Sequence, residues 1–429
     1  MEYQKTTLDN GLRVVSVSMP HTRSVSINIF VGTGSRYESD AEAGISHFAE
    51  HMFFKGTERR PTAREISEAI EGVGGVINAG TDRELTVFWA KVARPHFALA
   101  FDVLVDIMRN SRMDATEIEK ERQVIIEEVN MLRDDPREWV DVLIDETLWP
   151  GQALGRDVIG TKETVSSFDR AGILGYINSH YTPGNTVVSV AGNVEHDQVV
   201  EMVQQTLGQW APGLTESWQP AVRSQTAPIC RIGWKKTEQA HFCLAVPALS
   251  SRHPDRYALD LLNVILGEGM SSRLFQEIRE KRSLAYDVHS YVSHFLDTGS
   301  ATIYAGVDPT RIDGAIEGVI GELERLKDGI PEQEIIKAKE FTKGRLLLRL
   351  EDTRSVSSWN GAQELLLGEI LTPDEVVAVV ERLTVDDLQR VSRELFVEEQ
   401  FNLAIVGSFK RQKRFESLLR FGSSFASVS

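Results

Sequence analysis

The stretch VSSFDRAGILGYINSHYTPGNTVVSVAGN, residues 165–193, decides the fold because a related stretch occurs later in the chain. At a shift of 215 positions it meets VERLTVDDLQRVSRELFVEEQFNLAIVGS, residues 380–408. Both stretches begin with apolar residues at helical spacing and continue into a strand followed by glycine. VSINIFV (25–31) and AHFCLAV (240–246) match at the same shift. A repeat of this length predicts two similar halves.

We therefore predict an α+β fold with two homologous α/β-roll domains, each a mixed sheet packed with helices. Each half is expected to begin with strands, pass through helices and close with a helix–strand–helix unit. Residues 211–228 contain three prolines and little periodicity, as linkers do. The predicted domains are residues 1–217 and residues 218–429.

Composition narrows the classes of protein that the chain could be. Its 429 residues include 47 Lys and Arg against 63 Asp and Glu, so the formal net charge is −16. Nucleic acids and anionic membranes are unfavourable partners for such a chain, because phosphate affinity depends on Lys and Arg. Two cysteines exclude a disulfide framework. The first twenty residues lack the apolar core of a signal peptide, so we expect a cytoplasmic protein.

A metal-binding motif lies in the first half, in the segment GISHFAEHMFFKGT. It places His47, Glu50 and His51 in the order His-x-x-Glu-His, the pattern of inverzincin metallopeptidases. On a helix, residues four apart project together, so both imidazoles can bind one Zn²⁺ while the carboxylate faces the metal. The alternative is an ordinary surface helix that carries two histidines.

A catalytic zinc site also needs a third protein ligand. The segment TEIEKERQVIIEEVNML, residues 116–132, reads as a partly buried helix with Glu121 and Glu128 seven residues apart on one face. One of these carboxylates can bind the metal while the other supports a ligand. Spacing alone does not choose among Glu121, Glu127 and Glu128, and glutamates can also simply solvate a helix.

Together, HFAEHMFFKGT and ERQVIIEE resemble the pitrilysin-type (M16) zinc metallopeptidases, the family of insulin-degrading enzyme and the mitochondrial processing peptidase. LDNGLRVV, LGRDVIGTKETVSSF and YTPGNTVVSVAGNV extend the resemblance over nearly the whole chain. The resemblance implies that His47, His51 and Glu128 bind one Zn²⁺ per chain. It further implies that Glu121 supports the site and that Glu50 is the general base that activates the zinc-bound water.

The same resemblance implies residues that hold a peptide substrate. Asn78 and Ala79 match the contact positions of the family's substrate-binding edge strand. Without the resemblance, a plain structural hairpin would be the preferred explanation of that segment. Arg279 and Tyr286 match an Arg and a Tyr that help to hold the scissile carbonyl. Without the resemblance, we would interpret Arg279 as a surface arginine and Tyr286 as a packed tyrosine.

Specificity is the least determined property of the sequence. In the processing peptidase, two acidic residues that follow the third ligand recognise a substrate arginine. Glu138 matches the first of these positions, but Val142 departs from the second, and Asp141 and Asp145 lie nearby. An arginine preference is therefore only a hypothesis. An acidic chamber would favour short, unfolded and basic peptides.

The resemblance also implies a quaternary structure, because long family members carry four such domains and this chain carries two. We expect a homodimer whose chains complete one chamber, with a heterodimer with an inactive homologue as the alternative. The predicted function is a bacterial cytoplasmic zinc endopeptidase. The competing reading is a non-catalytic scaffold, or a partner subunit of a heterodimeric peptidase or respiratory complex.

Overall fold

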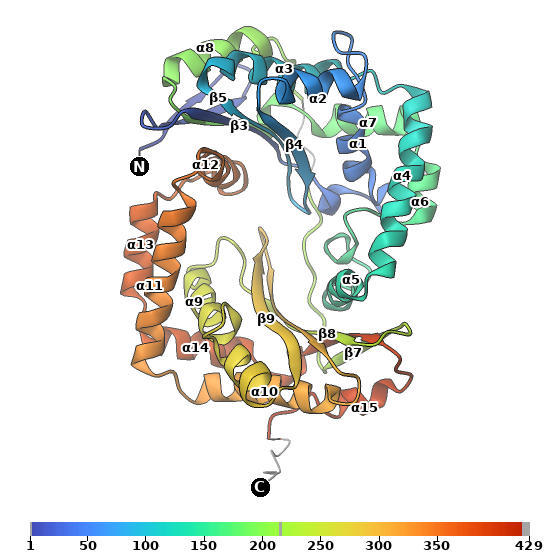
Figure 1. Ribbon diagram of the computed structural model, residues 1–429, viewed down its shortest axis with the longest axis vertical. Helices are drawn as coiled ribbons and strands as arrows, with labels where there is room; N and C mark the ends of the chain where they lie inside the picture. Colours follow the sequence, from blue (N-terminus) through green and yellow to red (C-terminus); the bar gives the residue numbers. More distant parts are fainter. Residues whose placement is uncertain (1, 214–216, 423–429) are drawn as a thin grey trace. The chain divides into compact units, whose positions relative to one another are not determined.

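The computed structural model describes residues 2–213 and 217–422, which form two compact units with one mixed β-sheet each (Figure 1). Unit 1 contains Met1–Val129, Arg156–Gln219 and Leu346–Asp374. Unit 2 contains Asn130–Gly155, Pro220–Arg345 and Glu375–Ser429. The predicted fold class, two mixed sheets packed with helices, is confirmed.

The sheet of unit 1 has six strands in the order β1-β2-β6-β3-β5-β4. Strands β2 and β6 pair in parallel, and the other neighbours pair antiparallel. Strand β4 therefore lies at one edge, with only β5 beside it. The six strands are β1 (Gln4–Thr7), β2 (Arg13–Ser18), β3 (Ser24–Val31), β4 (Val76–Thr81), β5 (Thr86–Ala93) and β6 (Thr186–Gly192).

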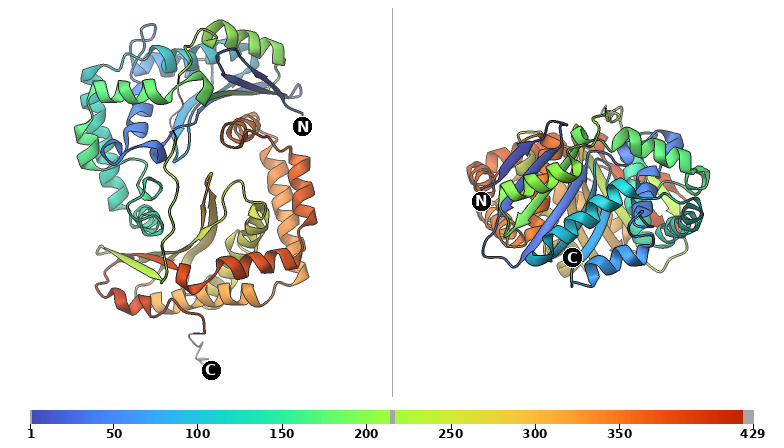
Figure 2. Two further views of the ribbon diagram at one scale, coloured as in Figure 1. Left: turned by 180° about the vertical axis from the view of Figure 1, so that it is seen from behind. Right: turned by 90° about the horizontal axis from the view of Figure 1, so that it is seen from above.

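Helices cover both faces of this sheet, as the views in Figures 1 and 2 show. One face packs on a large apolar core that includes Ile27, Ile29, Phe48, Phe101 and Ile173. The helices of unit 1 are α1 (Ile45–Phe53), α2 (Ala63–Glu71), α3 (Phe97–Asn110), α4 (Ala115–Asp134), α6 (Lys162–Ser167), α7 (Arg170–His180), α8 (His196–Leu207) and α12 (Thr353–Leu367); α4 continues a few residues into unit 2.

The opposite face of the sheet packs against α12 through small polar residues. The Asn28 amide donates hydrogen bonds to the Ser357 and Ser358 hydroxyls at 2.8 and 3.0 Å. Ser189 and Ser357 each donate a hydroxyl hydrogen bond to the other's carbonyl, at 2.8 and 2.9 Å. A β-carbon on Gly361 would meet Phe30 at 2.4 Å, so glycine permits this close approach.

The sheet of unit 2 has five strands in the order β7-β11-β8-β10-β9. Its strands are β7 (Ile229–Trp234), β8 (Ala240–Ala248), β9 (Ala285–His294), β10 (Gly299–Val307) and β11 (Asn402–Gly407). The helices of unit 2 are α5 (Pro136–Leu148), α9 (Arg256–Gly267), the π-helix η6 (Phe275–Lys281), α10 (Ile312–Asp328), α11 (Glu332–Arg349), α13 (Pro373–Arg382), α14 (Val385–Leu395) and α15 (Gln412–Glu416); α11 and α13 each extend a few residues into unit 1.

The two sheets repeat one topology. Strands β2, β6, β3, β5 and β4 correspond in order and pairing direction to β7, β11, β8, β10 and β9. Helix α7 shifted by 215 residues gives the bounds of α14. The predicted helix–strand–helix closing unit is present in both halves, as α7–β6–α8 and α14–β11–α15.

The packing units are not the two halves of the sequence, because the halves exchange one helix each. Helix α5, from the first half, packs on β11 and β8 of unit 2. Its counterpart at the 215-residue shift, α12, packs on β3 and β6 of unit 1. The domain bounds 1–217 and 218–429 stay a prediction drawn from the repeat. By packing, residues 130–155 belong to unit 2 and residues 346–374 to unit 1.

Two further observations concern single features. Cys230 and Cys243 are buried free thiols. Within residues 2–213 and 217–422, no helix has both the length and the hydropathy required to cross a bilayer. Part of the predicted linker, residues 214–216, lies outside the described residues.

Candidate metal centre

Helix α1 carries the His-x-x-Glu-His motif and begins at a tightly fixed point. Gly44 precedes it with φ 94°, a conformation that favours glycine. A β-carbon on Gly44 would meet the Ile159 carbonyl oxygen at 2.3 Å. The buried Glu38 carboxylate accepts hydrogen bonds from the Gly44 and Ser46 amides at 2.8 and 2.9 Å. These contacts fix where the helix starts and therefore where its histidines project.

The apolar face of α1 sets its rotation. Phe48, Ala49 and Met52 are fully buried in the core of unit 1. His47 and His51, on another face, remain 16% and 19% exposed. Because the buried face cannot turn outward without losing its packing, the two imidazoles must face the same partly open space.

Helix α4 supplies the carboxylates. Ile118 and Ile125 anchor it in the core, and the buried Arg122 guanidinium donates to the Val165 and Phe168 carbonyls. Glu121 and Glu128 lie on the side of the helix that faces α1. Glu121 is 6% exposed and Glu128 is 35% exposed, so the two occupy different environments.

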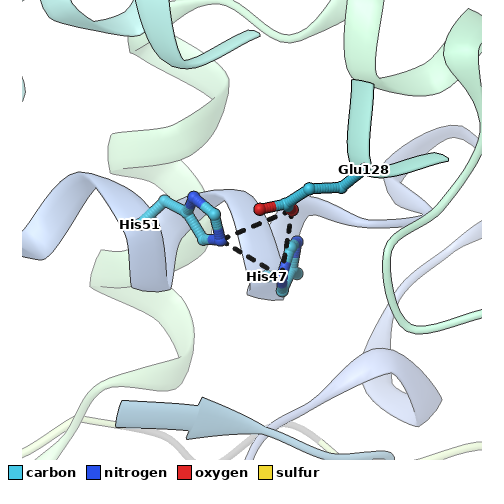
Figure 3. A group of neighbouring side chains, drawn as sticks. All are labelled: His47, His51 and Glu128. Carbon is cyan, nitrogen blue, oxygen red and sulfur yellow. Dashed lines mark hydrogen bonds and ion pairs between the residues drawn. The ribbon is translucent and has the colours of Figure 1, made fainter. Parts of the chain in front are cut away.

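Three side chains converge on one point, as Figure 3 shows. The Nε2 atoms of His47 and His51 are 3.2 Å apart. The Glu128 Oε2 atom lies 3.9 Å from His47 Nε2 and 3.8 Å from His51 Nε2. Among the described residues, this is the only such group of three or more His, Cys, Asp or Glu side chains.

The dimensions of this group fit a zinc ion. A circle through the three ligand atoms has a radius of about 2.1 Å, the length of a Zn–N or Zn–O bond in proteins. The His47 Nδ1 atom is buried without a hydrogen-bond partner. Burial, followed by the neighbouring His51, lowers the pKa of His47 to about 4, which favours the neutral imidazole that binds metals.

Glu121 orients His51, one of the three candidate ligands. His51 Nδ1 is 2.8 Å from Glu121 Oε1, and Lys55 Nζ is 2.5 Å from Glu121 Oε2. Burial alone would raise the pKa of Glu121, but the bonds from His51 and Lys55 lower it, so the group is a carboxylate. An ionised carboxylate can only accept, so His51 carries its proton on Nδ1 and presents the Nε2 lone pair.

Glu50 projects beside this group without joining it. Its Oε2 accepts a hydrogen bond from the Thr81 hydroxyl at 2.6 Å. Burial raises the pKa of Glu50 against the lowering effect of the Thr81 bond and of His51. A carboxylate with a raised pKa next to a metal site is suited to accept a proton and to return it.

The remaining predicted residues lie on four other elements. Asn78 and Ala79 are in the edge strand β4, exposed and half-buried respectively. Glu138 is exposed on α5 of unit 2. Arg279 in η6 and Tyr286 in β9, also in unit 2, contact one another: the guanidinium carbon lies 5.4 Å from the ring centroid. The side chain of Tyr286 is 74% exposed.

Three residues of this region were absent from the sequence-based prediction. Lys55 lies four residues after His51, in the turn that follows the end of α1. Thr81 lies two residues after Ala79 and therefore shares its side of β4. Glu38 caps α1 from a short loop, and no local pattern indicates that contact.

Two family models match the chain. The model described as "Insulinase (Peptidase family M16)" matches residues 13–162, and "Peptidase M16 inactive domain" matches residues 167–341. An uncharacterized zinc protease of Bacillus subtilis, YmxG, is 39% identical over 404 residues, covering 94% of this chain and 98% of that protein.

Solved structures agree with these matches. A protease from Helicobacter pylori superposes with a TM-score of 0.89 at 25% identity, over 95% of this chain and 99% of that chain. A chain of complex III2 from Candida albicans superposes with a TM-score of 0.84 at 21% identity, over 97% and 99%, and shows the fold alone. The sequence identity to named zinc proteases over nearly the full length shows that this chain belongs to the M16 peptidase family.

Proposed function

We propose that the protein is a zinc-dependent endopeptidase that hydrolyses short or unfolded peptides. The observation that carries the proposal is the convergence of His47, His51 and Glu128 on one point, with Glu50 beside it. Three protein ligands leave a position open, which distinguishes a catalytic zinc site from a closed structural one.

The chain's own residues account for the proton transfers of hydrolysis. Zinc, when bound, lowers the pKa of water and polarises a carbonyl oxygen. Glu50 accepts a proton from the attacking water, whose oxygen bonds to the peptide carbonyl carbon. As the C–N bond breaks, Glu50 returns that proton to the leaving nitrogen. Because Oε2 holds the Thr81 hydrogen bond, Oε1 is the oxygen available for this exchange.

Substrate positioning is proposed from the edge strand. One side of β4 pairs with β5, so the other can pair with an extended peptide through backbone hydrogen bonds, with Asn78 and Ala79 in contact. From the family resemblance, Arg279 and Tyr286 hold the scissile carbonyl, Glu138 favours arginine, and two chains complete the chamber as a homodimer in the bacterial cytoplasm.

A scaffold or partner-subunit role is less well supported. Complex III2 shares the fold, but this chain retains both histidines, the third ligand and the general base. The four residues have no evident purpose in a scaffold, and burying two histidines around an unfilled centre would cost stability.

The decisive experiment compares wild type with Glu50→Gln on a quenched, arginine-containing peptide, with zinc measured in both. We expect equal zinc and a kcat reduced by about 10²- to 10⁴-fold, the usual contribution of a general base. Glu127→Gln, on the exposed side of α4, is the matched control and should retain activity. Equal cleavage by wild type and Glu50→Gln, or no cleavage of a varied peptide set by wild type, would contradict the proposal.

A further inference from the structure

One side chain joins the edge strand to the general base. Thr81 is the last residue of β4, and its hydroxyl donates to Glu50 Oε2 at 2.6 Å. Side chains alternate along a strand, so Thr81 shares the side of Ile77 and Ala79, which pack against the core beneath. The free edge of β4 and the carboxylate of Glu50 are therefore separated by a single residue.

The Thr81 hydroxyl is a strand-borne donor to the Glu50 carboxylate. A displacement of β4 at Thr81 therefore displaces a group that orients Glu50. The carboxylate is partly buried, which makes the loss of a hydrogen bond costly.

The strand has conformational freedom next to this contact. Gly80 directly precedes Thr81, and a β-carbon there would meet nothing within 4 Å, so packing does not require glycine. Glycine within a strand weakens it because the backbone retains more freedom. Gly74, with φ 73°, gives similar freedom just before the strand. An extended peptide paired along β4 would restrict that freedom.

We infer that Thr81 is a positioning residue that transmits the docking of a peptide on β4 to the orientation of Glu50. The inference rests on the proposed function and deepens it, since it makes turnover depend on occupancy of the strand edge. Peptides that extend along β4 are then cleaved with a higher kcat than peptides that reach only the metal. Length selectivity thus arises from the catalytic step as well as from binding.

The test uses Thr81→Val, which removes the hydroxyl at constant shape, and Thr81→Ser, which restores it. Thr7→Val is the matched control, because Thr7 is the last residue of β1, at the opposite edge of the same sheet. Each variant is assayed with a short quenched peptide and with one long enough to pair with all of β4, about 20 Å at ~3.3 Å per residue. Affinity for the long peptide is also measured on zinc-free protein by fluorescence anisotropy.

For Thr81→Val, we expect kcat on the long peptide to fall by about 10- to 100-fold, the range for a hydrogen bond to a charged group. The short peptide should lose much less, and KM and the zinc-free Kd should stay within about twofold, because the hydroxyl faces Glu50 and not the peptide. Thr81→Ser should restore most of the rate, and Thr7→Val should match wild type.

Several results would overturn the inference. Equal losses on both peptides would limit Thr81 to local support of the carboxylate. A raised KM and zinc-free Kd at unchanged kcat would make it a substrate contact. A comparable loss in Thr7→Val would indicate general destabilisation of the sheet. No cleavage by wild type would overturn the proposed function and this inference with it, whereas normal wild-type cleavage and an unchanged Thr81→Val would overturn this inference alone.

Discussion

Glu121 lies between two proton-donating groups, with one oxygen toward His51 in α1 and the other toward Lys55 just after the end of α1. Helical spacing predicted that Glu121 and Glu128 share a face, but it could not assign their roles. The assignment depends on how α1 approaches α4, which places Glu128 beside both Nε2 atoms and Glu121 beside Nδ1. The position of α1 against α4 is set by core contacts between residues that are far apart in the sequence.

Replacing Lys55 tests whether the orientation of Glu121 matters for zinc. In Lys55→Met, Glu121 loses the partner of one oxygen and holds the His51 tautomer less firmly. Zinc affinity should fall by about 10- to 100-fold, the usual effect of losing such support. Competition with a chromophoric chelator measures it. Lys120→Met, which removes an ion pair to Glu117 on α4, should bind zinc as wild type does, and equal affinity in all three proteins would contradict the prediction.

At the scale of strands and helices, the repeat is more extensive in the structure than in the sequence. Two segments at one shift predicted two similar halves, and the structure extends the correspondence to all five strands of the smaller sheet. Periodicity could not predict the exchange of α5 and α12, because a hydrophobic pattern identifies the buried face of a helix but not the sheet that it covers. The exchange was also hard to predict because α12 contacts its sheet partly through the polar residues Asn28 and Ser189, which a hydrophobic pattern does not detect.

The end of β9 provides a pH-dependent contact within unit 2. His294 Nδ1 lies 2.7 Å from the Leu249 carbonyl and Nε2 lies 3.1 Å from Asp260. Both partners only accept hydrogen bonds, so the contact is complete when the imidazole is protonated. Burial would lower the pKa of His294, but the bond to Asp260, its charge and the Leu249 carbonyl together raise it.

Because the folded pKa lies above the unfolded value of about 6.5, this stabilisation is full below that pH and is lost as the pH rises through the folded pKa. Relative to wild type, His294→Gln should lower the free energy of unfolding by about 1 kcal/mol at acidic pH and by less at alkaline pH. Urea unfolding across this range measures the difference. The exposed His21→Gln serves as control, and a pH-independent difference for His294→Gln would refute the assignment.

At the scale of the whole molecule, the exchange makes each half depend on the other. Val140, Ile144 and Leu148 of α5 pack with Ala245, Ala404 and other apolar residues of the sheet in unit 2. Residues 1–217 alone would expose these side chains and would also leave the face of their own sheet that α12 covers without its helix.

We therefore expect residues 1–217 expressed alone to aggregate or to lack cooperative unfolding, despite containing all three proposed zinc ligands. Co-expression with residues 218–429 should restore a one-to-one complex that binds zinc. Size-exclusion chromatography and thermal unfolding provide the measurement. A monomeric, cooperatively unfolding fragment 1–217 would show that the exchanged helices are dispensable for folding.

The exchange also dictates an order of events during synthesis. A ribosome adds roughly 5–20 residues per second, so tens of seconds separate the emergence of the metal-binding helices from that of α12. Throughout this interval one face of the first sheet, with its serine and asparagine side chains, has no helix against it. Unit 1 can therefore complete its packing only after about residue 374 has been translated, although all of its strands are made much earlier.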